Sequence, residues 1–178
     1  MGLSTNPVTR ATQLITLGTH IRANLNPVVV AAVAIRDDVT VLTEYNKEAS
    51  PAVSAWRYNM RGLDLWKAMT LTQFDGITQA SKRELWLKWI DIANLEAVDF
   101  GRNENRNAVT DIWASLNSTQ MAALLGKLTE SATVFETAFP ITSETGGSGA
   151  SQVTAGDRSV TGPCTLNDIS DALNKTAP

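Results

Sequence analysis

The sequence holds few side chains that could carry out chemistry, and the two most reactive ones stand alone. His20 is the only histidine and Cys164 is the only cysteine. A zinc or iron site needs several histidine, cysteine or carboxylate ligands in a cluster, and a cysteine nucleophile needs a base beside it. We therefore expect His20 to be a structural or surface residue and Cys164 to be a poor nucleophile. We predict no catalytic residues, no metal site and no cofactor.

Short motifs typical of catalysis or nucleotide binding are also missing from the sequence. The stretch "GGSGA" (146–150) narrowly differs from the G-x-S-x-G nucleophile elbow, but that motif lies between a strand and a helix, and both flanks here are polar and glycine-rich. Neither a G-x-x-x-x-G-K-[ST] phosphate loop nor a G-x-G-x-x-G fingerprint occurs. Asp37 and Asp38 are adjacent, so on a helix they point about 100° apart and cannot easily share one site. The sequence therefore predicts a protein that is not an enzyme.

The net charge and the hydropathy pattern of the sequence limit the kinds of partner that this protein is expected to bind. The net charge of −3 argues against a sequence-specific or general nucleic-acid binder, which needs many Lys and Arg side chains on phosphates. The longest strongly apolar run, "PVVVAAVAI" (27–35), is far shorter than the roughly 20 residues that span a bilayer. One cysteine cannot form an internal disulfide, and the polar N-terminus lacks the layout of a signal peptide. We expect a protein that folds in a reducing cytoplasm and does not bind membranes.

The elements that must position any site are predicted to be helices. Asn6 and Pro7 are typical of a helix start, and Thr165 with Asp168 forms the spacing of a capping box. For residues 27–48 we favour one helix, with a strand over 28–33 as the alternative because of the β-branched residues. Helices are expected over residues 7–25, 27–48, 62–69, 80–95, 105–116, 118–128, 129–139 and 166–174, with a turn-rich link over 70–78.

The helix "ASKRELWLKWIDIANL" (80–95) is too apolar for an ordinary surface helix. Glu84, Lys88 and Asp91 form a narrow charged stripe along it, and apolar side chains cover most of the remaining surface. Such a helix must be buried in the centre of the domain or at a subunit interface.

Aromatic and basic residues on a connector predict a docking surface. Ser50-Pro51 ends the helix before it, and "AVSAWRYNM" (52–60) is expected to run extended because a proline disfavours helical conformation in the residue before it. Trp, Tyr and Arg dominate the binding energy of many protein interfaces. Core packing is the alternative role for the tryptophans. The candidate interface residues are Trp56, Arg57, Tyr58, Arg61, Trp86 and Trp89.

The composition changes after residue 139. The segment "PITSETGGSGASQVTAGDRSVTGP" (140–163) is rich in Gly, Ser and Thr and has too little apolar surface to fold alone. We therefore predict an all-α protein, a bundle of about six to eight helices. It would consist of a helical body (1–139), a Gly/Ser/Thr-rich arm or loop (140–163) that becomes ordered against neighbouring subunits, and a C-terminal helix and tail (164–178).

Three stretches stand out by their order and spacing: "YNKEASPAVSAWRYNM" (45–60), "LTESATVFETAFP" (128–140) and "TGPCTLNDISDAL" (161–173). Together they resemble a family of small uncharacterised virion-associated proteins of tailed bacteriophages, and the resemblance covers roughly residues 40–174. It implies a non-enzymatic structural component of the virion, assembled in the cytoplasm of the bacterial host.

Within this family resemblance we expect a ring-forming head-to-tail connector or adaptor of the neck. Its partners would be copies of itself in a ring and other virion proteins such as portal or tail components. The alternatives are a capsid decoration protein, a tail-tip structural protein, or a phage assembly chaperone or regulatory domain that does not remain in the virion.

Overall fold

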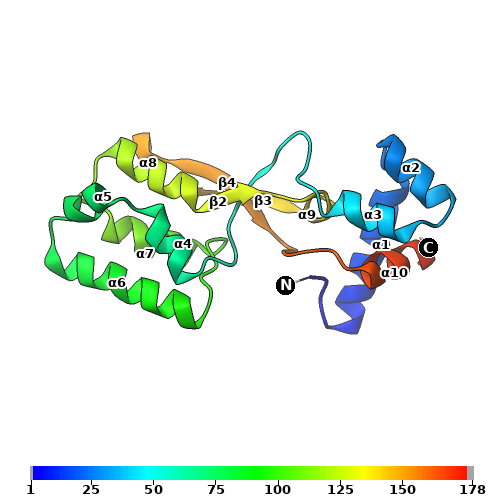
Figure 1. The fold of residues 1–178 in the computed structure, drawn as a ribbon, viewed down its shortest axis with the longest axis horizontal. Helices are drawn as coiled ribbons and strands as arrows, with labels where there is room; N and C mark the ends of the chain where they lie inside the picture. Colours follow the sequence, from blue (N-terminus) through cyan, green and yellow to red (C-terminus); the bar gives the residue numbers. More distant parts are fainter. Residues whose placement is uncertain (1, 176–178) are drawn as a thin grey trace. The chain divides into compact units, whose positions relative to one another are not determined.

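The computed structural model describes residues 2–175, so the last three residues of the predicted C-terminal tail lie outside the described residues. Ten α-helices account for most of the fold, but a four-stranded sheet accompanies them (Figure 1). Helices hold 56% and strands 13% of the residues. The prediction of an all-α bundle is therefore wrong.

The chain forms two compact units, each with its own hydrophobic core. Unit 1 contains residues 2–53, 131–141 and 158–175, and unit 2 contains residues 54–130 and 142–157. The structure thus divides the expected single helical body over both units. No helix within residues 2–175 is long and apolar enough to cross a membrane.

Unit 1 is built around the packing of the first helix against the last. The two come together at Gly18, where a Cβ atom would lie 2.4 Å from the carbonyl oxygen of Ala172. The predicted capping box at Thr165 is confirmed, because its hydroxyl accepts from the Asp168 amide at 3.2 Å. The helices of unit 1 are α1 (Pro7–Arg22), α2 (Pro27–Ala34), α3 (Asp38–Tyr45), α9 (Val134–Thr137) and α10 (Leu166–Asn174).

The single helix expected over residues 27–48 is divided into α2 and α3. Arg36 adopts a positive φ of 58°, which interrupts the helix, and the Asp37 carboxylate then accepts a hydrogen bond from the Thr40 amide at 3.1 Å. An aspartate that can cap a new helix competes with continuing the old one. The alternative strand over residues 28–33 is also not formed.

A buried ion pair joins two segments of unit 1 that are distant in sequence. Arg158 Nη1 lies 3.0 Å from Glu136 Oε2, and both side chains are almost fully buried. The same carboxylate accepts from the Thr133 and Gly162 amides, at 2.9 and 3.0 Å. Thr133 caps the helix in this region, and the helix predicted over 129–139 is shortened to α9.

Unit 2 holds five helices around a tryptophan-rich core. Trp86 and Trp113 pack edge to face with ring centroids 5.1 Å apart, and both are fully buried. The link predicted over residues 70–78 contains a short helix instead, which begins with a capping box between Thr70 and Gln73. The helices are α4 (Gly62–Ala68), α5 (Leu71–Gly76), α6 (Ala80–Leu95), α7 (Asn103–Ile112) and α8 (Ser118–Lys127).

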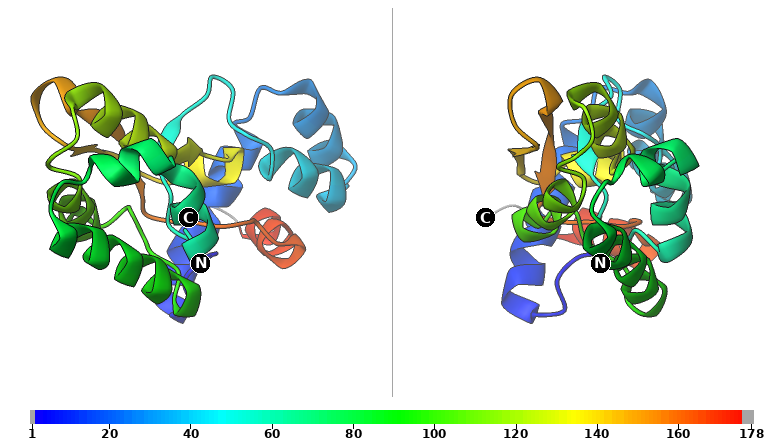
Figure 2. Two further views of the ribbon diagram at one scale, coloured as in Figure 1. Left: turned by 60° about the vertical axis from the view of Figure 1, so that its left-hand side comes forward. Right: turned by 90° about the vertical axis from the view of Figure 1, so that its left-hand side faces the viewer.

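Helix α6 runs along one side of unit 2 with α4 beside it (Figure 1, Figure 2). The two helices approach closely at Gly62. A Cβ atom there would lie 2.3 Å from Asn94 Oδ1 and 2.5 Å from the Ile90 carbonyl oxygen. Glycine at this position is what allows α4 to lie against the backbone of α6.

The four strands form one mixed sheet in the order β2-β1-β4-β3. Strand β1 pairs in parallel with β4, with Ala55 opposite Gly156. The strands are β1 (Ser54–Trp56), β2 (Thr129–Ser131), β3 (Ile141–Gly146) and β4 (Val153–Arg158), and a short 3₁₀ helix, η1 (Gly149–Ser151), lies between the last two.

The segment expected to be an arm over residues 140–163 therefore forms β3, η1 and β4. Backbone pairing holds these polar strands, and the indole Nε1 of Trp56 donates to the Glu144 carbonyl at 3.2 Å. Ala155 is buried in the core of unit 2 beside that tryptophan. The segment is thus ordered, with few apolar residues of its own, by main-chain pairing and by contact with Trp56.

Candidate interaction surface

Helix α6 uses one face for the core and leaves a second apolar face uncovered. Trp86 and Ala93, seven residues apart, are fully buried. Beside them, spaced at i, i+4, i+7 and i+11, lies a row that begins on α6 and ends at its C-terminal cap. We call these four residues, Leu85, Trp89, Ile92 and Glu96, the α6 row.

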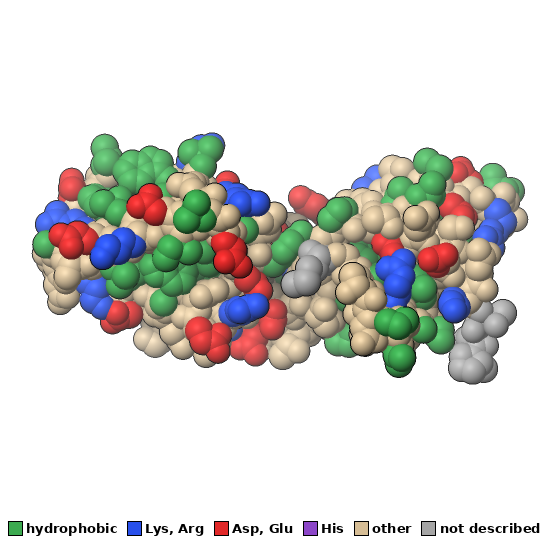
Figure 3. Space-filling view, turned by 90° about the horizontal axis from the view of Figure 1, so that it is seen from below, with side chains coloured by type: hydrophobic (Ala, Val, Ile, Leu, Met, Phe, Trp, Pro, Cys, Tyr) green, Lys and Arg blue, Asp and Glu red, His purple; other side chains and the backbone are tan. Residues whose placement is uncertain are grey.

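The exposed residues of α6 are more apolar than a surface helix requires. Ile92 is 55% exposed and Leu95 is 87% exposed, and Leu85 and Leu87 are also exposed. On the face of unit 2 turned toward the viewer in Figure 3, apolar side chains emerge between charged ones. The prediction that this helix is wholly buried in the centre of the domain is therefore wrong, and its second option, a subunit interface, stays a prediction.

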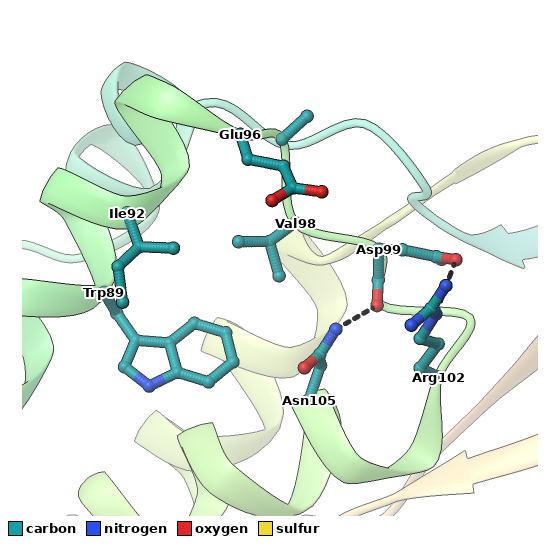
Figure 4. Close-up of a pocket in the computed structure, with 8 residues that line it drawn as sticks. Trp89, Ile92, Glu96, Val98, Asp99, Arg102 and Asn105 are labelled. Atoms are coloured by element: carbon teal, nitrogen blue, oxygen red, sulfur yellow. Dashed lines mark hydrogen bonds and ion pairs between the residues drawn. The ribbon is translucent and has the colours of Figure 1, made fainter.

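A pocket of about 350 Å³ opens at the C-terminal end of the α6 row (Figure 4). The Trp89 indole forms one wall, held from behind by Phe100, whose ring lies 6.4 Å away at an interplanar angle of 27°. Ile92 and Val98 add apolar surface, and Asn105 lies across from the indole. The lining residues are Trp89, Ile92, Glu96, Ala97, Val98, Asp99, Arg102 and Asn105.

Hydrogen bonds fix the polar side of this pocket. Asn105 Nδ2 donates to the Asp99 carbonyl at 2.7 Å, and the Gly101 amide donates to Asp99 Oδ1 at 2.8 Å. Arg102 Nε lies 3.6 Å from Asp99 Oδ2. These contacts anchor the loop that follows α6, so the pocket has one wall on a helix and the other on a stabilised loop.

A second depression of about 290 Å³ shares Asp99 and Arg102 with the pocket. Three further carboxylates line it, those of Glu104, Glu144 and Asp157.

Arg106 also lines the second depression. It is fully buried, and its guanidinium group binds partners within unit 2. It donates to the Phe100 and Gly101 carbonyls at 2.7 and 2.6 Å and to Glu144 at 3.2 Å, and it lies 5.1 Å from the centroid of the Trp56 ring. The two depressions together carry five carboxylates against two guanidinium groups.

The structure does not gather the six predicted interface residues into one surface. Trp56 and Trp86 are buried in the core of unit 2, so both have the packing role that was the alternative for the tryptophans, and neither presents surface to a partner in this structure. They are large enough to fill the space between the sheet and the helices, which is why the core takes them. Trp89 is half-buried and lines the pocket.

The basic connector is part of the sheet region rather than a free docking loop. The Arg57 amide donates to the Leu128 carbonyl, and its own carbonyl accepts from the Phe100 amide. Its side chain lies 3.8 Å from Asp64 and 3.6 Å from Glu130. Tyr58 is half-buried, and Arg61 is exposed at the start of α4.

Two further groups of apolar residues on the surface were not recognised as sites in the sequence. In unit 2, Trp66 and Leu71 are exposed beside a small hollow that reaches the core. In unit 1, α2 has no charged residue, and its exposed side chains include Val28 and Val30. The signal for α2 was its uncharged sequence "PVVVAAVA", because a short helix without charged residues has apolar side chains on every face.

The two potentially reactive side chains are both involved in packing within unit 1. The Tyr45 hydroxyl lies 2.8 Å from His20 Nδ1 and accepts from Asn24 Nδ2 at 3.3 Å. Burial lowers the pKa of His20, which favours the neutral imidazole. Burial, with the nearby Asp168 carboxylate, raises the pKa of Cys164 to about 12, so this thiol stays protonated near neutral pH.

Comparison with known proteins finds no relative of this chain. No family model, no curated protein and no solved structure matches the chain. Among residues 2–175, no group of three or more His, Cys, Asp or Glu side chains is placed to hold a metal ion. The α6 row, with the pocket at its end, is the surface with the most distinctive combination of shape and chemistry.

Proposed function

We propose that this chain is a non-enzymatic structural component of a tailed-bacteriophage virion, where it forms a ring as a head-to-tail connector or adaptor. Its partners are copies of itself and other virion proteins such as portal or tail components. Assembly takes place in the cytoplasm of the bacterial host. The family resemblance of residues 45–60, 128–140 and 161–173 supports this proposal.

The observation that carries the proposal is the exposed apolar surface on both units. Large apolar patches on a soluble chain mark interaction sites, because leaving them in water costs roughly 25 cal/mol per Å². Unit 2 exposes Ile92 and Leu95 on α6, and unit 1 exposes Val28, Val30 and Ile35 on or just after α2. An assembly subunit has a reason to retain such residues, since they are buried when its partners bind.

The chemistry of the two surfaces also fits a ring. A closed ring repeats one heterologous contact, in which one surface of each copy meets a different surface of the next. The α2 surface is wholly uncharged, whereas the α6 row ends in an acidic pocket. Two unlike apolar surfaces, one on each unit, therefore suit a heterologous contact better than a self-complementary one.

Quantitative mass spectrometry of density-gradient-purified phage particles from the system that encodes this chain tests the proposal. We expect its peptides at a copy number close to that of the portal protein. A copy number near that of the major capsid protein would instead support decoration of the shell. Absence from the particles, with the chain present in the infected cell, would contradict a virion role and support an assembly chaperone.

A further inference from the structure

The pocket at the end of the α6 row combines an aromatic wall with an acidic rim. The Trp89 indole faces the hollow, and the Glu96 carboxylate lies at its edge near Val98 (Figure 4). No hydrogen bond or ion pair of the Glu96 side chain is found among the described residues. A tryptophan face and an available carboxylate both attract a cation, the first through its ring quadrupole and the second through its charge.

A hydrogen-bond acceptor faces the same hollow. Asn105 donates its Nδ2 group to the Asp99 carbonyl at 2.7 Å, which leaves its amide oxygen on the side of Trp89 (Figure 4). An amide oxygen and a carboxylate are acceptors, so they complement a group that carries only donors. Among protein side chains, the arginine guanidinium is planar, carries five N–H donors and stacks well on an indole ring.

We propose that this pocket binds the guanidinium group of an arginine side chain from a partner protein. The planar group lies against Trp89 and donates to Glu96 and to the amide oxygen of Asn105. A volume of about 350 Å³ accommodates one long side chain. The five carboxylates of the pocket and the adjoining depression, against two guanidinium groups, supply the charge complementarity for a basic segment.

The two arginines already present do not take this role. Arg106 is buried and bound to main-chain carbonyls and Glu144. Arg102 is paired with Asp99, 71% of its side chain is exposed, and its guanidinium lies near that aspartate rather than on the indole. A basic segment of another virion protein, rather than the uncharged α2 surface of a neighbouring copy, supplies this arginine, so the biological meaning of the pocket rests on the proposed function, although the binding test itself does not.

The test is a titration of the isolated full-length protein with acetyl-arginine N-methylamide, followed by the indole N–H signals in a ¹H–¹⁵N NMR spectrum. Acetyl-citrulline N-methylamide, a neutral probe of nearly the same shape, is the control ligand. We expect a saturable shift of the Trp89 indole signal with a Kd of roughly 10–100 mM, as fits one exposed cation–π contact, one ion pair and one hydrogen bond. The citrulline probe should bind at least several-fold more weakly.

Matched variants locate the contact. Glu96→Gln should weaken arginine binding about two- to five-fold, as expected for the loss of one exposed ion pair, while Glu84→Gln, the same change on α6 outside the pocket, should leave it unaltered. Trp89→Leu, which identifies the Trp89 signal by its loss, should abolish the shifts of the Asn105 side-chain amide. The assignment would be overturned if both probes bind equally well or if the two glutamine variants have equal affinities for the arginine probe. Tighter binding of the corresponding lysine probe, or the absence of a saturable shift, would also overturn it.

Failure of this inference and failure of the proposed function are distinguishable. Absence of the chain from purified particles would contradict the virion role and leave a positive titration standing. A negative titration, with the chain present at portal-like copy number, would remove only the arginine pocket.

Discussion

Trp86 and Trp89 are three residues apart on the same helix and have different roles. Trp86 is fully buried against Trp113, at the centre of unit 2. Trp89 is packed on Phe100 on one side and lines an open pocket on the other. The difference shows that α6 has more apolar surface than the core of unit 2 can cover. The residue type is the same in both cases, so the two roles are distinguished by the face of the helix on which each tryptophan lies.

The largest effect is expected for the buried member of this pair. Trp86→Ala should lower the free energy of unfolding by about 3–5 kcal/mol, because it removes a large side chain from a fully packed site. Trp89→Leu should lower it by less than about 1 kcal/mol, since that side chain is only partly buried and leucine restores part of the contact. Urea denaturation followed by circular dichroism measures both. Similar losses of unfolding free energy in the two variants would contradict the distinction between the buried and the pocket-lining tryptophan.

The same comparison can be made with two glutamates. Glu136→Gln should destabilise unit 1 by about 3–5 kcal/mol, because the buried guanidinium group of Arg158 would lose the negative charge of this carboxylate. Glu96→Gln, at the rim of the pocket, should change stability by less than about 0.5 kcal/mol. Thermal unfolding of both variants tests this prediction. A neutral effect of Glu136→Gln would mean that the buried pair contributes little, as holds for some buried ion pairs.

Polar substitutions on the exposed part of α6 should impair assembly while leaving the stability of the folded chain nearly unchanged. In the double variant Ile92→Ser and Leu95→Ser, both side chains are exposed, so the stability should change by about 1 kcal/mol or less. Incorporation into particles should fall severalfold or more, because the contact loses its apolar area. Complementation of a phage that lacks the gene, with the variant supplied from a plasmid, measures incorporation. Normal incorporation of a stable variant would exclude this face as an interface.

The smallest effect is a dependence of stability on pH through His20. Burial lowers its pKa below the ordinary 6.5, so the folded chain favours the neutral imidazole more than the unfolded chain does. The resulting stabilisation is fully present above pH 6.5 and is lost as the pH falls toward the pKa of the folded state. His20→Gln should flatten the change in melting temperature across this range. An unchanged pH profile in that variant would assign the dependence to other groups.

Local signals in the sequence located most helices correctly. Asn6-Pro7 and the Thr165–Asp168 capping box define their helix starts through contacts within one turn, and the structure confirms both. The helix over residues 80–95 was also predicted with its bounds, because its pattern extends over more than four turns. These elements are specified by neighbours in the sequence, so no knowledge of the tertiary fold was needed.

The sheet and the pocket depend on contacts between distant segments. Strands β3 and β4 are mostly polar, and they are ordered by strand pairing: β4 pairs with β1, about 100 residues earlier in the chain, and β3 pairs with β4. The pocket combines the Trp89 ring with Glu96, Asp99 and Asn105, which lie on two helices and the loop between them. Trp89 was predicted from the sequence as a candidate interface residue, but the polar groups that face Trp89 in the pocket are positioned by the turn that follows α6.

The most direct test of the account is hydroxyl-radical footprinting of this chain, free in solution and within purified particles, read by mass spectrometry. We predict that Ile92 and Leu95 are oxidised in the free protein and strongly protected in the particle, while Trp86 and Trp113 are protected in both states. Equal oxidation of Ile92 and Leu95 in the two states would contradict the claim that the exposed face of α6 is an assembly interface.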